Sequence, residues 1–104
     1  MRLRVLKQAE WEAIDAAEWY EERLEGLGTA FLNEYESALE RIEAEPGRFS
    51  RLETVTVPRE IRRLLLRRFP YLVVYEVLTN EVMVLAVAHV SRRPNYWIDR
   101  ADEE

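Results

Sequence analysis

The residues with the clearest capacity for chemistry lie near the C-terminus, in the stretch HVSRRPNYW at positions 89–97. This stretch holds the only histidine of the chain, His89, and follows a run of small and β-branched apolar residues that is typical of a buried strand. The adjacent Arg92 and Arg93 suit bidentate contacts with a phosphate or a carboxylate group. The stretch is therefore either a C-terminal flap that seals a core or a cationic functional edge.

Length and composition predict one domain that spans residues 1–104, because a chain that is 48% hydrophobic can form a single modest core. We find no apolar run long enough to cross a membrane and no signal-peptide pattern at the N-terminus, so we expect a cytoplasmic protein without a membrane partner. With no cysteine and one histidine, the chain is not expected to form disulfides or a zinc site. We expect no metal, no cofactor and no small-molecule substrate.

Charge is distributed unevenly along the chain. Residues 1–50 hold six basic and twelve acidic side chains, whereas residues 59–93 hold seven arginines and only three glutamates. The net charge of −5 argues mildly against a general nucleic-acid binder, but the local balance matters more than the total. The pattern predicts an acidic surface from the first half and a basic surface from the second.

The N-terminal half has the pattern of a strand followed by two helices. Residues 1–6 alternate apolar and basic side chains and predict a short edge strand, whereas residues 8–24 show the spacing of an amphipathic helix. After a glycine-containing break, Gly28 or Thr29 is expected to cap a second helix that ends before Pro46. Two helices joined this way form a hairpin. The expected core stripes are Ala13, Ala16, Ala17, Tyr20 and Leu24 on the first helix, and Phe31, Leu32, Tyr35, Ala38, Leu39 and Ile42 on the second.

The C-terminal half has the pattern of three strands. Residues 48–58 form the connector that leads into it. Strand-like runs follow at residues 60–68, 71–78 and 81–90. The short turns between them predict an antiparallel meander, and the last two runs are apolar on nearly every residue, so both of their faces should be covered. The predicted fold is α+β with the order β-α-α-β-β-β, in which a helical hairpin packs on a small, mainly antiparallel sheet that the N-terminal strand joins.

Three stretches, in this order and spacing, resemble one known family. They are AEWYEERLEGLGTAFLNEYESALERIEAEPGRF, RRLLLRRFPYLVVYEV and VLAVAHVSRRPNYWIDR. Together they resemble the ParE/RelE superfamily of toxins from bacterial type II toxin–antitoxin systems, and specifically its ParE-like, plasmid-stabilisation branch. The most specific parts are Trp19-Tyr20-Glu21 followed by Leu27-Gly28, then Phe69-Pro70-Tyr71, then His89 followed by Arg92-Arg93-Pro94 and Trp97. The resemblance covers nearly the whole chain and implies the same fold and a cognate antitoxin that neutralises the toxin.

Two mechanisms divide this superfamily. ParE-like members are described as poisons of DNA gyrase, whereas RelE-like members are mRNA endonucleases that act on the ribosome. Metal-free RNA cleavage requires a base, cations for the phosphate and an acid for the leaving oxygen. If the chain is a nuclease, the candidate catalytic residues are Arg63, Arg68, Arg92 and Tyr96. Arginine is a poor acid or base because its pKa is so high, so the sequence favours gyrase poisoning. A decayed, non-toxic homologue that still binds its antitoxin is a third interpretation.

His89 and the strand arginines also have structural interpretations. His89 alternates in phase with Met83, Leu85 and Val87, which favours a structural, hydrogen-bonded histidine over a catalytic one. The side chains in the pairs Arg62-Arg63 and Arg67-Arg68 are expected to point to opposite faces of a strand, so at most one of each pair faces a given site. Charges that keep a sheet edge from aggregating are the alternative role for these arginines.

The candidate partner-binding residues are Arg92, Arg93, Trp97, Trp11 and Trp19. The arginine pair lacks an obvious packing purpose, which favours a functional role. Trp97 and Tyr96 are expected mainly to anchor the tail against the helices, with base stacking as the lesser alternative. The two helix tryptophans fall about 80° apart and outside the apolar stripe. They either pack on the second helix or contact the antitoxin.

Overall fold

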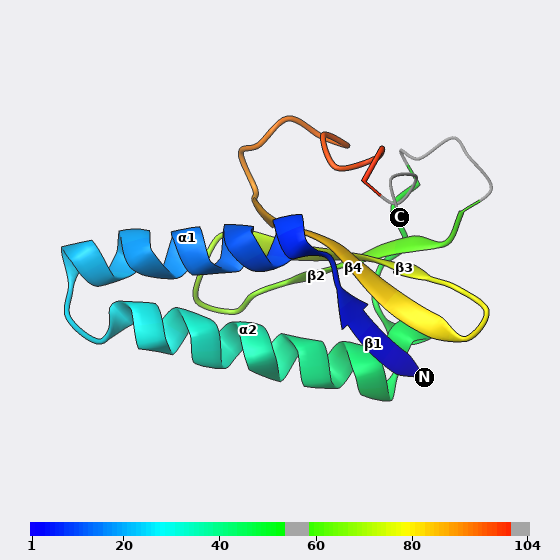
Figure 1. Ribbon diagram of the computed structural model, residues 1–104, viewed down its shortest axis with the longest axis horizontal. Helices are drawn as coiled ribbons and strands as arrows, with labels where there is room; N and C mark the ends of the chain where they lie inside the picture. Colours follow the sequence, from blue (N-terminus) through cyan, green and yellow to red (C-terminus); the bar gives the residue numbers. More distant parts are fainter. Residues whose placement is uncertain (54–58, 101–104) are drawn as a thin grey trace.

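The computed structural model describes residues 1–53 and 59–100, which form a four-stranded sheet with two helices on one face (Figure 1). In chain order the elements are β1 (Arg2–Val5), α1 (Lys7–Arg23), α2 (Leu27–Ala44), the short 3-10 helix η1 (Pro46–Arg48), β2 (Ile61–Leu65), β3 (Tyr71–Val77) and β4 (Glu81–His89). The predicted α+β class and β-α-α-β-β-β order are therefore confirmed. In the described ranges, no helix combines the length and apolar character that a membrane crossing requires.

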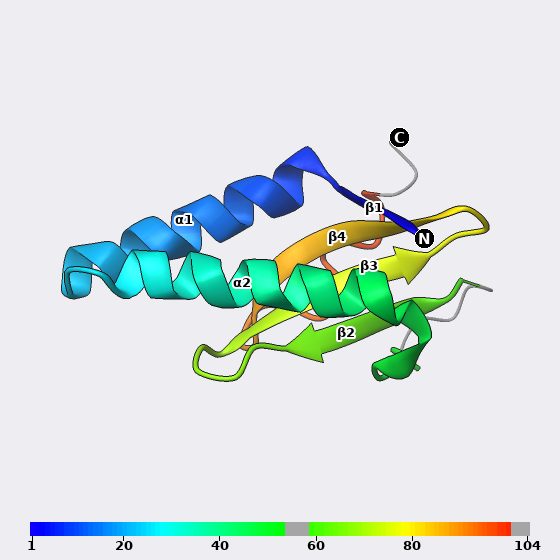
Figure 2. The ribbon, with the colours of Figure 1, turned by 90° about the horizontal axis from the view of Figure 1, so that it is seen from below.

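The strand order in the sheet is β1-β4-β3-β2, so β1 lies at an edge as predicted (Figure 2). Strands β2, β3 and β4 form the predicted antiparallel meander, and β1 pairs with β4 in parallel. A parallel pair needs a long crossover connection, and here the helical hairpin contributes to that connection. This pairing places α1 directly after an edge strand and alongside β4.

A β-bulge interrupts the pairing of β3 with β4. The register shifts by one residue, which leaves Leu85 without a partner in β3. His89 pairs with Tyr71 and Met83 pairs with Glu76. Tyr71 and Glu76 are an odd number of residues apart, so they lie on opposite faces of β3. The prediction that His89 is in phase with Met83 was therefore wrong, because the bulge reverses the alternation.

The main core lies between the helices and the sheet, and its helical side largely follows the predicted stripes. The buried helix residues are Ala9, Ala13, Ala16 and Ala17 on α1 and Phe31, Tyr35, Ala38 and Ile42 on α2, while Leu32 and Leu39 are partly buried. The small alanine side chains let α1 approach β4 closely. Leu24 is exposed, contrary to the prediction, because α1 ends at Arg23 and the next residue is extended.

The turn between the helices is capped differently from the prediction. Gly26 precedes α2 in the left-handed conformation, with φ of 88°, which glycine adopts readily. The Glu21 carboxylate on α1 accepts hydrogen bonds from the backbone N–H groups of Gly26 and Gly28, both at 2.9 Å. The sequence predicted that Gly28 or Thr29 caps α2, but the capping group is the Glu21 side chain of α1. A Cβ on Gly28 would lie 2.5 Å from the Ala17 carbonyl oxygen, so this glycine allows the two helices to pack closely.

Strand β2 is shorter than predicted. It ends at Leu65, and the chain bends through residues 67–70. Arg67 and Arg68 therefore leave the sheet, and the backbone N–H of Arg68 donates to Glu34 of α2 at 2.8 Å. The predicted alternation of these two arginines across a strand was wrong for this reason.

The outer edge of β2 is partly covered by the connector. The Arg63 N–H donates to the Ser50 carbonyl at 3.0 Å, and the Leu52 N–H donates to the Ile61 carbonyl at 2.8 Å. The last part of the predicted connector, residues 54–58, lies outside the described residues.

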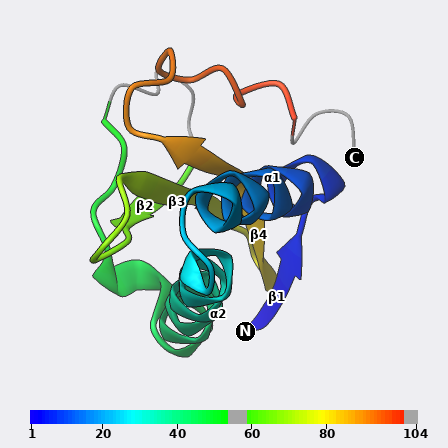
Figure 3. The same cartoon turned by 90° about the vertical axis from the view of Figure 1, so that its left-hand side faces the viewer.

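The face of the sheet away from the helices is covered by residues 90–100, which we call the tail. Figure 3 shows the tail above the sheet and α2 below it. Both faces of β3 and β4 are therefore covered, as their apolar sequences predicted.

Candidate interaction site around the C-terminal tail

One carboxylate, that of Glu12 on α1, holds the tail in place. The Tyr96 hydroxyl donates to Glu12 Oε2 at 2.6 Å, and the Arg100 guanidinium donates to both carboxylate oxygens at 2.9 and 3.0 Å. Glu12 Oε1 also accepts the backbone N–H of Val87 at 3.0 Å. Arg100 in turn donates to the carbonyl of Leu85, the bulged residue, at 2.9 Å. Glu12 therefore joins the helix, strand β4 and the tail.

Trp97 fixes the tail to the sheet. Its side chain is only 3% exposed and lies beside Leu72, Val74 and Ala88 on the face away from the helices. Of the two expected anchors, Tyr96 holds the tail to a helix, whereas Trp97 holds it to the sheet. Because it is buried, the Trp97 ring is not on the surface that a partner could reach in this conformation.

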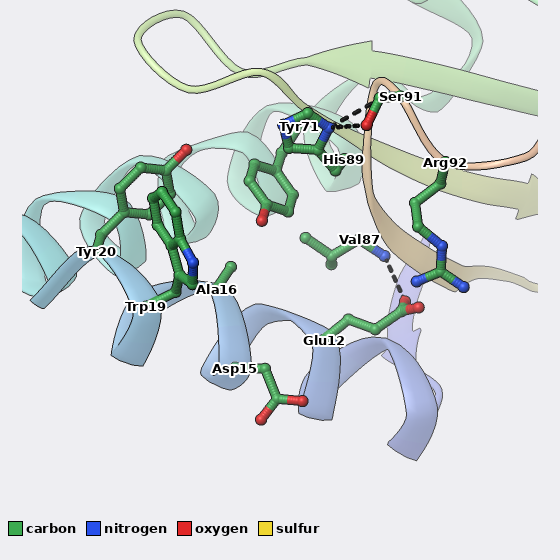
Figure 4. Close-up of a pocket in the computed structure, with 10 residues that line it drawn as sticks. All are labelled: Glu12, Asp15, Ala16, Trp19, Tyr20, Tyr71, Val87, His89, Ser91 and Arg92. Carbon is green, nitrogen blue, oxygen red and sulfur yellow. Dashed lines mark hydrogen bonds between the residues drawn. The ribbon is translucent and has the colours of Figure 1, made fainter. Parts of the chain in front are cut away.

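A groove of about 470 Å³ separates α1 from the end of β4 (Figure 4). We call it the α1 groove. Aromatic rings form much of its wall, and Asp15 and Arg92 place opposite charges along it. Its lining residues are Glu12, Asp15, Ala16, Trp19, Tyr20, Tyr71, Val87, His89, Ser91 and Arg92.

His89 lines this groove and is hydrogen-bonded through its ring. Its Nδ1 accepts the backbone N–H of Ser91 at 3.0 Å and lies 2.8 Å from the Ser91 hydroxyl. A backbone N–H can only donate, so in the neutral ring Nδ1 is the acceptor and the proton is on Nε2. The ring also packs edge-to-face on Tyr71 with centroids 5.2 Å apart. The ring is therefore hydrogen-bonded, as expected, and the structural role that the sequence favoured over a catalytic one stays a prediction.

A second cavity, of about 230 Å³, lies between the tail and the sheet. We call it the arginine pocket, because Arg63, Arg92 and Arg93 line it and no acidic residue does within the described ranges. The Arg92 guanidinium stacks 3.9 Å from the centre of the Tyr96 ring. Many other arginines of the described part have a glutamate partner, namely Arg2, Arg4, Arg48, Arg59, Arg62, Arg68 and Arg100. The three pocket arginines have none there, so their positive charges remain uncompensated by carboxylates.

The structure brings together three of the four residues named for a nuclease. Arg63, Arg92 and Tyr96 line the arginine pocket, whereas Arg68 lies beside α2 with its Nε 3.4 Å from Glu34. Burial and the hydrogen bond to Glu12 raise the pKa of Tyr96 well above its usual value. The Tyr96 hydroxyl is thus protonated and already engaged in a hydrogen bond.

The remaining candidate residues lie on the surface. Arg93 is exposed, as are Trp11 and Trp19 on α1. Trp19 lines the α1 groove, and the Arg23 guanidinium lies 3.4 Å from the centre of its ring. Its ring also meets Tyr20 of the same helix edge-to-face. Their partner-binding roles stay predictions.

Sequence reasoning did not identify Glu12 and Arg100 as organising residues. Arg100 lies 88 residues from Glu12 in the chain, so no local pattern links them. The sequence held one weak indication that Glu12 lies near the core, because Glu12 is next to the buried alanine stripe of α1. In residues 1–53 and 59–100, no group of three or more His, Cys, Asp or Glu side chains is arranged to hold a metal ion.

Comparisons with known proteins agree with this architecture. Residues 3–94 match the family model described as ParE toxin of type II toxin-antitoxin system, parDE. The fold is similar to a solved chain of the chromosomal ParDE TA system from P. aeruginosa, with a TM-score of 0.61 and 22% sequence identity over 86% of this chain and 95% of that chain. No curated protein sequence matches the chain.

Proposed function

Because the chain belongs to the ParE toxin family of type II toxin–antitoxin systems, we propose that it binds and poisons DNA gyrase and that a cognate antitoxin neutralises it. Membership of the family makes the chain a toxin component. Gyrase as the target and neutralisation by an antitoxin go beyond that assignment and are the proposed part.

The observation that supports gyrase poisoning is the lack of a free proton-transfer group among the residues named for cleavage. RNA cleavage without a metal needs a base and an acid beside the phosphate. Of these residues, Tyr96 alone carries a group suited to proton transfer, and its hydroxyl donates to Glu12. His89 nearby already uses Nδ1 as an acceptor for Ser91. Arginines that have no available proton-transfer group beside them are suited to binding an anionic surface rather than to transferring protons.

A specific observation also favours the alternative, a ribosome-dependent mRNA endonuclease. Arg63 and Arg92 line one pocket, where they could stabilise the charge of a cleaved phosphate. This alternative requires Tyr96 to leave Glu12 and transfer a proton during the reaction.

Growth arrest and mRNA integrity distinguish the two mechanisms. We expect the wild-type protein, expressed without antitoxin, to stop bacterial growth and to leave mRNA intact in a reconstituted translation extract. The double variant Arg92→Ala, Arg93→Ala should lose the arrest. Arg67→Ala is the matched control, since Arg67 is exposed but lies outside the arginine pocket.

Three results would change this assignment. Ribosome-dependent cleavage of mRNA by the wild-type protein would establish the endonuclease. Arrest that survives the double substitution would remove the arginine pair from the mechanism. Binding to the product of a neighbouring antitoxin gene without any growth arrest would identify a decayed toxin.

A further inference from the structure

A separate hollow, of about 400 Å³, lies between α2 and the turn that joins β2 to β3 (Figure 2). We call it the α2 hollow. One wall is a stripe of α2 whose residues recur at three- and four-residue spacing, and the other is the start of the turn. Its polar lining residues are Asn33, Glu34, Ser37, Arg41, Arg67 and Arg68.

The α2 hollow is basic although the chain as a whole is acidic. Three guanidinium groups and one carboxylate leave a local charge of +2, against a net charge of −5 for the chain. The carboxylate, that of Glu34, is already engaged, because it accepts the Arg68 backbone N–H at 2.8 Å and lies 3.4 Å from Arg68 Nε. Arg41 and Arg67 have no carboxylate partner in the described part. Two positive charges in the hollow are therefore uncompensated.

The Arg41 side chain is held in place without a partner. Its Nε is buried and has no hydrogen-bond partner among the described residues. Arg41 lies in the last turn of α2, where the helix dipole favours a cation. That position explains the charge, but it gives the guanidinium no acceptor. A side chain that is already fixed loses little freedom on binding, so this guanidinium is suited to an anionic ligand.

The lining favours a phosphate monoester over the phosphodiesters of a nucleic acid. Guanidinium groups bind phosphate oxygens, and the exposed side chains of Asn33 and Ser37 add neutral donors. A phosphate monoester carries about −1.5 to −2 charges at neutral pH and has three free oxygens, which matches the local charge, whereas each backbone diester carries one charge. The described lining includes no aromatic ring on which a base could stack.

We propose that the α2 hollow binds the phosphate group of a small phosphate monoester. Arg41 and Arg67 neutralise the phosphate, while Asn33 and Ser37 donate hydrogen bonds to its oxygens. Glu34 keeps the turn against α2 and so holds the two walls together. The described linings of the α2 hollow and the arginine pocket share no residue, so substitutions in the hollow should leave growth arrest intact.

A titration of the full chain with adenosine 5′-monophosphate tests this assignment. NMR follows the backbone amides and the arginine Nε–H groups. We expect shifts at Ser37 and at the Arg41 Nε–H, and an affinity about tenfold lower for Arg41→Gln, which loses the charge. Inorganic phosphate should compete, whereas adenosine should not bind. Arg93→Ala removes an exposed arginine from the arginine pocket instead and should bind like the wild type.

A second pair of variants avoids the half-buried Arg41. Ser37 is exposed, so Ser37→Asp and Ser37→Asn are expected to fold, and thermal unfolding checks this. The aspartate places a negative charge in the hollow and should weaken binding about tenfold, whereas the asparagine has nearly the same size without the charge and should keep most of the affinity. Equal affinities of the two variants would contradict a site for an anion.

Other outcomes would also overturn the proposal. Equal losses in Arg93→Ala and Arg41→Gln would place the phosphate in the arginine pocket. Adenosine that binds as tightly as its monophosphate would mean that the phosphate is not recognised. Tighter binding of a DNA oligonucleotide without a terminal phosphate would identify a nucleic-acid surface, and an unchanged Arg41 Nε–H signal at millimolar ligand would exclude the site. The titration uses neither gyrase nor growth arrest, so a failure of the proposed function leaves its result unchanged.

Discussion

Glu12 differs from the other acidic residues of α1 because it accepts four hydrogen bonds from two distant parts of the chain. Its side chain and that of Arg100 are only 17% and 18% exposed, so this ion pair is largely shielded from water. The sequence could not distinguish Glu12 from a solvated helix acid, because the distinction arises only when the tail folds back on α1. The arginines were easier to single out, because their positive charges are concentrated in one part of the sequence.

We expect Glu12→Gln to lower the free energy of unfolding by about 3 kcal/mol, since it leaves the shielded Arg100 without its counter-charge. The measurement is urea denaturation followed by tryptophan fluorescence. Asp15→Asn is the matched control on the same helix, and as an exposed substitution it should change stability by no more than about 0.5 kcal/mol. Similar effects of the two substitutions would mean that Glu12 does not hold the tail.

Glu21 gives the structure a dependence on pH. Hydrogen bonds from the Gly26 and Gly28 N–H groups lower the pKa of Glu21 from its ordinary value of 4.5. The ionised carboxylate therefore stabilises the fold above that ordinary pKa, and this contribution disappears as the pH falls through the lower pKa of the folded state. We expect Glu21→Ala to melt below the wild type at neutral pH and the difference to shrink below about pH 4.

Melting temperatures measured across this pH range check the role of Glu21. Glu22→Ala removes a neighbouring exposed acid and serves as the control. A melting difference for Glu21→Ala that persists unchanged in strong acid would show that the carboxylate does not act through its charge.

The helices and strands were predicted well where the apolar spacing is local. The 3.6-residue period located α1 and α2 to within a few residues, and the apolar runs located β3 and β4. Strand β2 was extended too far because the run of arginines and leucines at residues 62–68 continues into the bend at residues 67–70. The bulge at Leu85 left no trace in the sequence, since β4 is apolar on nearly every residue and has no alternation to interrupt.

The close packing of the two helices depends on Gly28. We expect Gly28→Ala to lower the free energy of unfolding by about 1–3 kcal/mol, because the added Cβ would lie 2.5 Å from the Ala17 carbonyl oxygen and force the helices apart. Guanidinium denaturation measures the change. Gly47→Ala is the control, since a Cβ there has no neighbour within 4 Å. If both substitutions proved equally mild, the hairpin would not require a glycine at this contact.

The whole molecule separates its charges by face. The α1 groove is lined by two carboxylates and one guanidinium group, whereas the arginine pocket is lined by three guanidinium groups and, within the described ranges, no carboxylate. The sequence also predicted the family and the element order, because both depend on patterns that span the chain. It could not predict that Arg63 and Arg92 share a pocket while Arg68 lies apart, since this depends on where β2 ends and how the tail returns.

The most direct test of the proposed activity is a DNA supercoiling assay with purified gyrase and the toxin freed of antitoxin. The account predicts that increasing amounts of the toxin inhibit supercoiling or accumulate cleaved DNA, and that the double variant Arg92→Ala, Arg93→Ala does so far less. Unaffected supercoiling, together with cleavage of mRNA on translating ribosomes, would contradict the account and make the arginine pocket a catalytic surface.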